Sequence, residues 1–413
     1  MTLLVGSLGL LTSCFAPADD GEVEEVAILD EVALGAKFEI PDDFKIGFIC
    51  LHNENSTYDL NFLRAADTIK EHLGLTDDQV VIEKDIPEDN ACYEAAIRLV
   101  NRGCKVIFAN SFGHEDHIIK AAEENPTVQF CHATGTKARV KNLANYHNAF
   151  ASIYEGRYLA GVAAGLKLNE MIENEEITAD EAIIGYVGAY PYAEVVSGYT
   201  SFFLGARSVC PSATMKVRYT NEWYHYEKEK NAATSLINVD NCVLISQHAD
   251  SMGAPSVCET AGVPNIAYNG STVTDCPNTF IIASAINWAP YYYEIIKATV
   301  NGTAIPTNYT GTISTGSVVL SLLNTGAAAE GTEATLKAVA AELIAGTRKV
   351  FDTDTFTVNN QKVTEYLADV IDNGDYQGDT NVIIDGEFVE SGDDFRSAPY
   401  FDLRIDGITE INN

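Results

Sequence analysis

Basic side chains are scarce in this 413-residue chain, which has 26 Lys and Arg against 59 Asp and Glu and a formal net charge of −33. Such an acidic chain repels phosphate backbones and anionic lipid headgroups. These repulsions argue against nucleic acid as a partner and against membrane contact through basic patches. The acidity is typical of a solvated surface in a saline or crowded setting and does not point to a specific partner.

Catalytic motifs are also missing. The strand-to-helix turns contain no G-x-S-x-G, no phosphate-binding P-loop and no G-x-G-x-x-G, and no C-x-x-C spacing suits zinc or an iron-sulfur cluster. A nucleoside hydrolase needs several aspartates after its first strand to hold calcium, and residues 52–59 do not supply them. His114 and His117 could share one helical face, but the acidic pair between them equally suits a helix amino terminus. We therefore predict no enzyme, no cofactor and no metal.

An apolar stretch at residues 3–14 is too short to cross a bilayer and has the length of a signal-peptide core. Its end, Leu11-Thr-Ser-Cys14, resembles the bacterial lipobox, in which the cysteine is lipidated. The sequence thus predicts a lipoprotein signal peptide at residues 1–14, lipidation of Cys14 and an acidic linker at residues 15–43 that acts as a spacer. The alternative is a cleaved or disordered apolar tail with an incidental cysteine.

Eight further cysteines lie between Cys50 and Cys276. An even number in an exported protein permits disulfides, but a chain of this length does not need them for stability. Cys50, Cys131 and Cys242 fall inside strand patterns, where a thiol packs as a small apolar group. We expect most of the eight to be reduced.

Short apolar runs that are typical of buried strands recur along the chain, and each ends at polar and aromatic residues. In an open parallel α/β sheet, ligands bind beyond the carboxyl ends of the strands, where such side chains gather. Helical patterns separate the runs, and this alternation predicts parallel sheets with right-handed crossovers. The strand runs are residues 45–51, 106–109, 183–188, 242–245, 264–268 and 280–283.

The runs form two successive sets, which predicts two Rossmann-like lobes with a boundary near residues 148–165. Gly156, Gly161 and Gly165 lie along a helix there, and we expect this surface to pack closely against another backbone. The predicted N-terminal lobe comprises residues 44–152 and 284–305. The predicted C-terminal lobe comprises residues 153–283 and 306–400, with residues 401–413 as a tail.

Several motifs together resemble the basic membrane protein family of ABC-importer solute-binding lipoproteins, from about residue 45 to residue 357. The resemblance implies a type 1 periplasmic-binding fold and a purine nucleoside or purine base held between two lobes. The motifs are Ser111-Phe-Gly113, Tyr154-Glu-Gly-Arg-Tyr-Leu-Ala-Gly161, Phe203-Leu-Gly-Ala-Arg207, Gln247-His-Ala-Asp-Ser251, Ile286-Asn-Trp288 and Val350-Phe-Asp-Thr-Asp-Thr-Phe-Thr357.

Carried over by position, the resemblance implies a set of ligand contacts from both lobes. The first-strand loop departs from the family, which often has an aspartate and a tryptophan where this chain has Asn53 and Ser56. Glu194, which also follows a strand, is added as a candidate. The implied contacts are Asn53, Tyr58, Ser111, Phe112, Trp223, Asp250 and Asn269.

The residue types suit a purine. Stacking a base on an aromatic ring contributes about 1–3 kcal/mol, and Phe112, Trp223 and Trp288 follow strand ends where they could do so. Asp250 can accept two hydrogen bonds from ribose hydroxyls or from the N–H edge of a base, and asparagines can read donor and acceptor pairs. Each has an alternative: the aromatic rings could pack in a core, Asp250 could cap a helix, and Tyr58 and Glu194 could be solvated loop residues.

The predicted protein is a monomer that captures a small molecule by hinge closure and docks on an ABC permease. We expect it at the extracytoplasmic face of the bacterial cell membrane, held only by its lipid. Two alternatives stay open: a binding protein for a sugar or furanosyl signal, and a ligand sensor on the same fold. A repressor is disfavoured because the amino terminus is apolar and acidic and has no basic headpiece.

Overall fold

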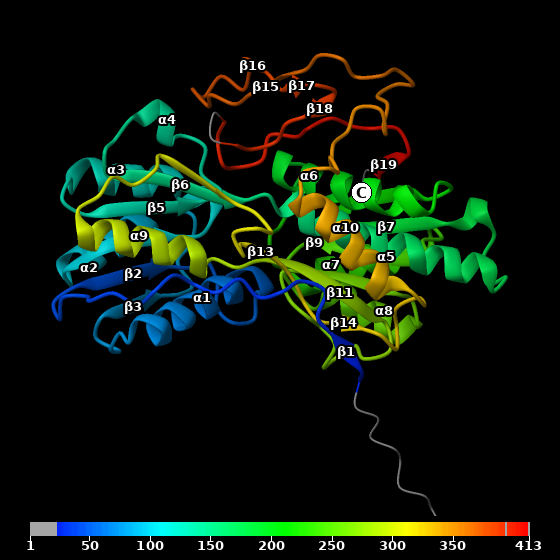
Figure 1. The fold of residues 1–413 in the computed structure, drawn as a ribbon, viewed down its shortest axis with the longest axis horizontal. Helices are drawn as coiled ribbons and strands as arrows, with labels where there is room; N and C mark the ends of the chain where they lie inside the picture. The colour runs from blue at the N-terminus through cyan, green and yellow to red at the C-terminus, as the bar shows by residue number, and fades with distance from the viewer. Residues whose placement is uncertain (1–22, 393–394, 412–413) are drawn as a thin grey trace, which may run out of the picture.

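A computed structural model describes residues 23–392 and 395–411 of the chain. Within these residues the chain forms two α/β lobes side by side, each built on one large sheet (Figure 1). The predicted signal peptide and Cys14 lie outside the described residues.

The sheet of the N-terminal lobe has the order β12-β6-β5-β4-β2-β3, and every neighbouring pair is parallel. Helices α1 and α9 contact each other on one face, while α2 and α3 cover the other. The strands are β2 (Lys45–Ile49), β3 (Val80–Glu83), β4 (Cys104–Ala109), β5 (Gln129–Ala133), β6 (Tyr146–Ala151) and β12 (Asn308–Gly311). The helices are α1 (Thr57–Leu73), α2 (Asn90–Asn101), α3 (Glu115–Glu124), α4 (Ala138–Lys141) and α9 (Ala289–Asn301), with the short 3-10 helix η1 (Phe112–His114).

The sheet of the C-terminal lobe has the order β13-β11-β10-β9-β7-β8-β19 and is parallel except for the β11–β13 pair. The strands are β7 (Ile183–Gly188), β8 (Thr214–Tyr219), β9 (Leu244–His248), β10 (Asn265–Tyr268), β11 (Phe280–Ile286), β13 (Val318–Leu320) and β19 (Ile408–Ile411). The helices are α5 (Ile153–Glu173), α6 (Ala193–Val209), α7 (Tyr226–Asn238), α8 (Gly253–Ala261) and α10 (Thr332–Ile344), with η2 (Ala179–Glu181).

Helices α5 and α6 pack closely, as the small residues of α5 predict. A Cβ atom on Gly161 would lie 1.9 Å from the carbonyl oxygen of Phe202, so only glycine fits at this crossing. Leu159 of α5, Phe202 of α6 and Tyr186 of β7 are fully buried between this helix pair and the sheet. The predicted packing role of the glycine-containing helix is confirmed.

The chain passes between the lobes at residues 151–153, 286–289 and 311–318. Backbone hydrogen bonds join these segments, from Ser152 N to Gly311 O (2.7 Å) and from Asn287 N to Ser317 O (2.8 Å). The crossing segments therefore lie together and form the connection about which the lobes could move.

Two predicted boundaries are corrected. Residues 306–400 were assigned to the C-terminal lobe, but β12 pairs with β6 and so belongs to the N-terminal lobe. Residues 401–413 were assigned to a tail, but β19 pairs in parallel with β8 and closes the edge of the second sheet. The segment after α9 was assigned to one lobe because its short strands carry no long apolar run.

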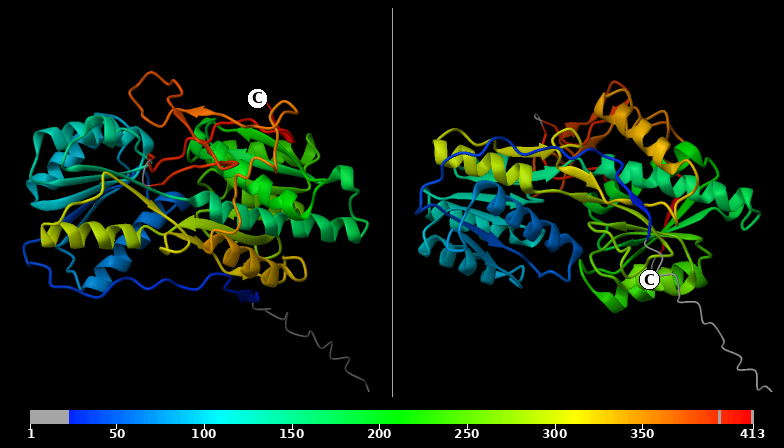
Figure 2. Two further views of the ribbon diagram at one scale, coloured as in Figure 1. Left: turned by 45° about the horizontal axis from the view of Figure 1, so that its top comes forward. Right: turned by 60° about the horizontal axis from the view of Figure 1, so that its bottom comes forward.

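The predicted spacer is also corrected where it is described. Strand β1 (Glu25–Val26) pairs with β14 (Leu323–Asn324) on the C-terminal lobe. The chain then crosses to the N-terminal lobe, where Tyr293 Oη donates to Ala36 O at 2.8 Å. In the left view of Figure 2 this blue segment and the orange-to-red C-terminal segment run along opposite sides of the molecule. Residues 23–43 are therefore packed against both lobes and do not form a free spacer.

Among the described residues, no helix combines the length and apolar character needed to cross a membrane. The cysteines from Cys50 to Cys276 are all buried and carry free thiols. Their burial agrees with the predicted role of Cys50, Cys131 and Cys242 as small apolar groups in the sheets.

Candidate functional site

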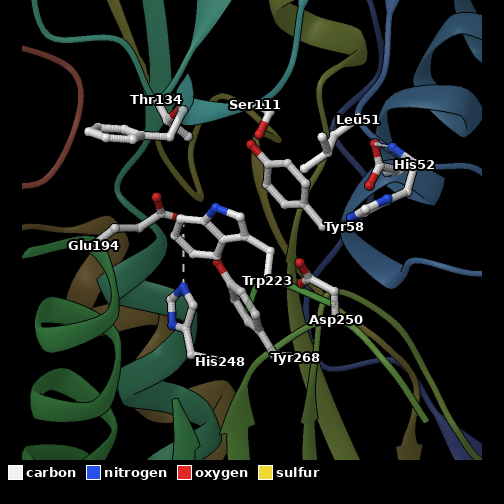
Figure 3. A pocket seen from close by; sticks show the side chains of 12 residues that line it. Leu51, His52, Tyr58, Ser111, Thr134, Glu194, Trp223, His248, Asp250 and Tyr268 are labelled. Atoms are coloured by element: carbon white, nitrogen blue, oxygen red, sulfur yellow. Dashed lines mark hydrogen bonds and ion pairs between the residues drawn. The ribbon is translucent and has the colours of Figure 1, made fainter. Parts of the chain in front are cut away.

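A cavity of about 390 Å³ lies between the lobes, where the carboxyl ends of both parallel sheets meet. This figure includes solvent at the mouth of the cavity, so the space enclosed between the lobes is smaller. Side chains from both lobes point into it (Figure 3). The lining residues are Leu51, His52, Tyr58, Asp59, Ser111, Phe112 and Thr134 from the N-terminal lobe, and Glu194, Trp223, His248, Asp250 and Tyr268 from the C-terminal lobe.

Asp59 organises the first loop. Its buried carboxylate accepts hydrogen bonds from Ser56 Oγ (2.7 Å), Asn110 Nδ2 (2.6 Å) and the backbone N–H of His52 (3.1 Å). Ser56 is also the N-cap of α1 and accepts from Asp59 N. Tyr58, on the same turn, donates to Asn110 O at 2.7 Å. This network fixes the loop after β2 to the end of β4 and holds the Tyr58 ring at the cavity wall.

The loop after β4 is held by Glu88. Its carboxylate oxygen accepts from Ser111 Oγ at 2.5 Å and from Gly113 N at 2.8 Å. Phe112 lies between these two contacts and its side chain is 44% exposed. Its ring faces Tyr192 of the other lobe with 5.6 Å between centroids. Phe112 is thus a supported aromatic ring at the mouth of the cavity.

Thr134 follows β5 in an unusual backbone conformation. Its φ is +67°, a region that a β-branched residue rarely adopts. Its backbone N–H donates to Ala149 O at 3.1 Å, and its buried hydroxyl has no partner among the described residues. Strained backbone concentrates at functional sites, and a buried hydroxyl needs a partner. Thr134 is therefore a candidate to contact a ligand.

In the C-terminal lobe, His248 and Tyr268 end neighbouring strands, and their rings lie 4.2 Å apart between centroids. His248 Nε2 lies 3.6 Å from Glu194 Oε1, longer than a hydrogen bond. Burial lowers the pKa of His248, and the nearby Glu194 only partly opposes this, which favours the neutral form of the imidazole. Both ring nitrogens of His248 and the Tyr268 hydroxyl lack close partners among the described residues.

Aromatic rings cluster beside these groups. Trp223 lies edge-on to Tyr190 at 5.1 Å, and Tyr190 stacks on Tyr192 at 4.9 Å. With Phe112 across the cleft, the cavity mouth has aromatic faces from both lobes. Flat, weakly polar rings suit such a site.

Asp250 lies at the junction of the lobes. Its carboxylate accepts from Asn269 Nδ2 at 3.2 Å, and its backbone oxygen accepts from Thr57 N at 3.0 Å, across the cleft. Burial raises the pKa of Asp250 well above its usual value, and the carboxylates of Glu229, Asp59 and Glu194 raise it further. A ligand that donates hydrogen bonds to this carboxyl would stabilise its ionised form.

The residues that line the cavity include the carboxyl groups of Asp59, Glu194 and Asp250 and, in the described part of the chain, no Lys or Arg. A phosphate or carboxylate in this space would meet like charge without a compensating cation. The site therefore disfavours an anionic ligand and suits one that has an aromatic face and several hydrogen-bond donors.

The structure brings together most of the predicted contacts but leaves three outside the cavity. Asn53 donates to Asp85 Oδ1 at 2.9 Å, and Asn269 lies behind Asp250. Trp288 is 2% exposed and stacks on Phe62 at 4.5 Å, so it is a core residue of the N-terminal lobe. The predicted residues that line the cavity are Tyr58, Ser111, Phe112, Glu194, Trp223 and Asp250.

Six lining residues were not predicted. His248 belonged to a motif that was recognised, and Tyr268 ends a predicted strand run, so position at a strand end was an available signal for both. His52 and Asp59 lie in the predicted polar cluster after β2, which Leu51 precedes. Thr134 follows β5, whose run of residues was not used as a strand.

His114, which was considered as a metal ligand, lies inside the N-terminal lobe. His114 is fully buried, and its Nε2 lies 2.9 Å from Ile86 O. Burial lowers the pKa of His114 to about 4. Across the described residues, no three or more His, Cys, Asp or Glu side chains are grouped to hold a metal ion.

Two parallel α/β lobes with a cavity at their facing strand ends define the type 1 periplasmic solute-binding fold. A solute-binding protein of an ABC transporter from Conexibacter woesei superposes with a TM-score of 0.59 at 18% identity, over 74% of this chain and 98% of that chain. A transcriptional activator of the comK gene from Bacillus halodurans gives 0.59 at 15% identity, over 74% and 99%. At these identities the likeness shows the fold, which confirms the predicted fold class.

The chain belongs to the Bmp family, ABC transporter substrate-binding protein PnrA-like, whose model matches residues 75–325. The purine-binding protein BAB2_0673 of Brucella abortus is 33% identical over 281 residues, 67% of this chain and 75% of that protein. The putative glucose-binding protein TsgA13 of an ABC transporter in Haloferax volcanii is 35% identical over 211 residues, 51% of this chain and 50% of that protein. The predicted family is confirmed.

Proposed function

We propose that this protein captures a purine nucleoside or purine base between its lobes and delivers it to an ABC permease. The observation that carries this proposal is the interlobe cavity, which joins aromatic faces to buried carboxyl groups and has no Lys or Arg in its described lining. A purine offers a flat ring to Phe112 and Trp223, and N–H or hydroxyl donors to Asp250. The similarity to a purine-binding relative supports the same ligand class.

Capture occurs by hinge closure in this proposal. Contacts across the cleft support it: Thr57 N and Thr57 Oγ1 both donate to Asp250 O, and Asn61 Nδ2 donates to Asn269 Oδ1 at 3.4 Å. These bonds join α1 of one lobe to strand ends of the other. A ligand that bridges the lobes would add to them and so favour the closed state. The ligand undergoes no chemistry.

A sugar is the second candidate ligand. The relative TsgA13 is described as a putative glucose-binding protein, and carboxylates with aromatic faces also bind sugars. A ligand sensor would use the same closing lobes. Direct binding measurements distinguish a purine ligand from a sugar ligand.

Lipidation of Cys14 would hold the protein at the extracytoplasmic face of the cell membrane. We expect it to act there as a monomer. Replacing Cys14 with alanine in the native host tests this. We expect the variant to leave the membrane fraction and to lose incorporated radiolabelled palmitate. If the variant stays in the membrane fraction and still incorporates palmitate, lipidation of Cys14 is refuted.

The ligand class is tested by thermal-shift titration of soluble protein starting at Phe15, after unfolding and refolding to remove co-purified ligand. The panel is adenine, adenosine, guanosine, inosine, cytidine, ribose, glucose and galactose. Ligand at about a thousandfold over its dissociation constant adds about 4 kcal/mol of stability. A shift with purines alone supports the proposal, and adenine against adenosine shows whether ribose is read. A melting shift with sugars alone, or no melting shift with any compound of the panel, refutes the purine assignment.

A further inference from the structure

The chain continues beyond the family match at residue 325, through α10, into a C-terminal extension whose described residues, 345–392 and 395–411, contact both lobes. It runs along the top of the molecule in Figure 1, from the C-terminal lobe toward the N-terminal lobe and back to β19. Its short hairpins are β15 (Leu367–Ala368) with β16 (Thr380–Asn381) and β17 (Ile383–Ile384) with β18 (Glu387–Phe388).

The extension has a packed aromatic centre. Phe401 stacks on Phe351 at 4.4 Å and lies 4.5 Å from Phe388, and all three are at most 1% exposed. Phe351 also contacts Tyr154 of α5 at 5.3 Å. The extension is therefore folded against the C-terminal lobe at the start of its first helix.

Glu390 joins the extension to α6. Its carboxylate accepts from Ser197 Oγ and from the backbone N–H groups of Tyr400 (2.9 Å) and Phe401 (2.7 Å). Ser197 is one residue before Gly198, where a Cβ atom would lie 2.3 Å from Nδ1 of His248. The segment of α6 held by Glu390 is thus the segment that packs against a cavity histidine and also carries Glu194.

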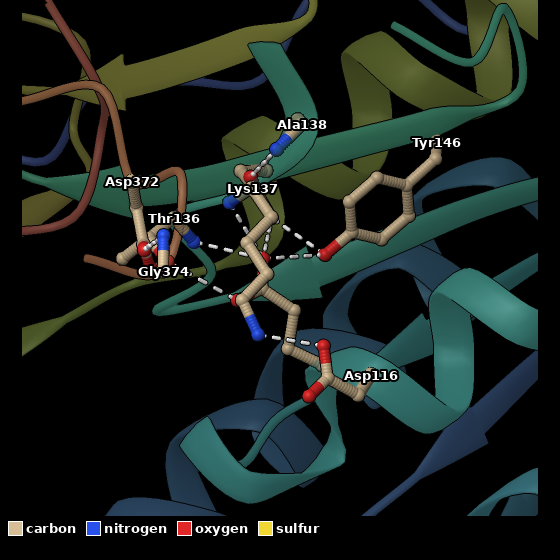
Figure 4. A network of polar contacts seen from close by, with 9 residues as sticks. Asp116, Thr136, Lys137, Ala138, Tyr146, Asp372 and Gly374 are labelled. Carbon is tan, nitrogen blue, oxygen red and sulfur yellow. Dashed lines mark hydrogen bonds and ion pairs between the residues drawn. The ribbon is translucent and has the colours of Figure 1, made fainter. Parts of the chain in front are cut away.

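Asp372 joins the extension to the N-terminal lobe. Its Oδ2 accepts from Thr136 Oγ1 at 2.5 Å (Figure 4). Glu115 also holds this loop, because its Oε1 accepts from Thr136 N (2.8 Å), Lys137 N (2.9 Å) and Tyr146 Oη (2.8 Å). Its Oε2 lies 3.2 Å from Thr136 Oγ1 and competes with the nearer Asp372 for the one hydroxyl proton. Thr136 lies two residues after Thr134, the strained residue that lines the cavity.

These two attachments of the extension, one in each lobe, are thus close in sequence to residues that line or pack against the cavity. The extension also contacts β12 of the N-terminal lobe, where Ser397 N donates to Asn308 Oδ1 at 3.4 Å. We propose that the C-terminal extension is a tether between the lobes, in which Asp372 and Glu390 are positioning residues for the two walls of the ligand site. By holding Thr136 and Ser197 at once, it limits how far the ligand-free lobes separate. It also slows release of a bound ligand, a consequence that rests on the proposed function.

The first test measures lobe separation without a ligand. Spin labels at Asn101→Cys and Glu173→Cys, which are exposed and in different lobes, report distances by double electron-electron resonance, while the native thiols between Cys50 and Cys276 are buried. We expect Asp372→Ala to move the distribution toward longer distances. Asp372→Asn keeps an oxygen acceptor for Thr136 and should restore the wild-type distribution.

The matched control is Asp375→Ala, which removes the same charge from the same turn, where Asp375 Oδ1 accepts from Gln377 N at 3.0 Å. It should leave the distances unchanged. A wild-type distribution for Asp372→Ala, or an equal shift for Asp375→Ala, would overturn the tether.

The second test uses adenosine as the probe and follows its dissociation by stopped-flow tryptophan fluorescence. Loss of one hydrogen bond to a charged group predicts about tenfold faster release from Asp372→Ala, with Asp372→Asn and Asp375→Ala near wild type. Unchanged release from Asp372→Ala would contradict the positioning role. If adenosine does not bind the wild-type protein, the purine assignment fails, and the distance measurement still decides the tether.

Discussion

Asp250→Asn separates the two roles of this residue, because the contact that Asp250 makes across the cleft uses its backbone oxygen. The substitution keeps the side-chain shape and the contact with Thr57 but removes the charged acceptor. Hydrogen bonds to charged groups contribute about 1.5–3 kcal/mol, so we expect purine binding to weaken by about 10- to 100-fold. Isothermal titration with adenosine and inosine measures the change.

Folding stability should change in the opposite direction. Burial and the carboxylates of Glu229, Asp59 and Glu194 raise the pKa of Asp250 well above its usual value of 3.8. A raised pKa in the folded state means that this carboxyl stabilises the fold below pH 3.8 and that its contribution is lost as the pH rises. Asp250→Asn should therefore raise the melting temperature at pH 8 relative to wild type.

The pH dependence of binding gives a third readout. A ligand that donates to the carboxylate binds its ionised form, so wild-type affinity should increase with pH, and Asp250→Asn should lose this dependence. Asp275→Asn, an exposed position in the same lobe, is the control and should match wild type. Wild-type affinity in Asp250→Asn, with the same pH profile, would refute the assignment of Asp250 as the acceptor.

Four further variants test other features. Trp223→Ala should weaken purine binding by about 5- to 100-fold, whereas Trp288→Ala should cost about 3–5 kcal/mol of folding stability, measured by urea unfolding. Gly161→Ala places a Cβ 1.9 Å from Phe202 O and should cost about 1–3 kcal/mol, and a neutral result would contradict the close packing of α5 on α6. Burial raises the pKa of Glu390 from 4.5 to about 7. The folding stability of the wild type should therefore fall by up to about 3 kcal/mol between pH 4.5 and 7.5. Melting curves at several pH values should show a smaller fall for Glu390→Gln.

Local sequence patterns were sufficient for much of the fold. The bounds of β7 coincide with the predicted run at residues 183–188, because the apolar run and the flanking polar residues agree there. Strand β9 was predicted to end at residue 245 but continues to His248, since parallel strands buried on both faces can carry paired polar residues such as Ser246 and Gln247. This early end is one reason why His248 was missed as a cavity residue.

Other features depend on contacts that local patterns do not record. Trp288 follows a strand, as ligand residues do, but the strand belongs to one lobe and the next helix to the other, so its ring turns into the core against Phe62. Thr134 was not selected because β5, the strand that it follows, was not predicted, and the local sequence gives no signal for its positive φ. Strands β12 and β19 are short and pair with partners far away in sequence.

The buried thiols can report local unfolding of each lobe. Cys50, Cys92, Cys104 and Cys131 lie in the N-terminal lobe, and Cys210, Cys242, Cys258 and Cys276 lie in the C-terminal lobe. A thiol reagent can modify them only when the surrounding structure opens. Peptide mass spectrometry after timed alkylation would therefore follow each lobe separately in the unaltered chain, and would show whether a ligand protects both lobes equally.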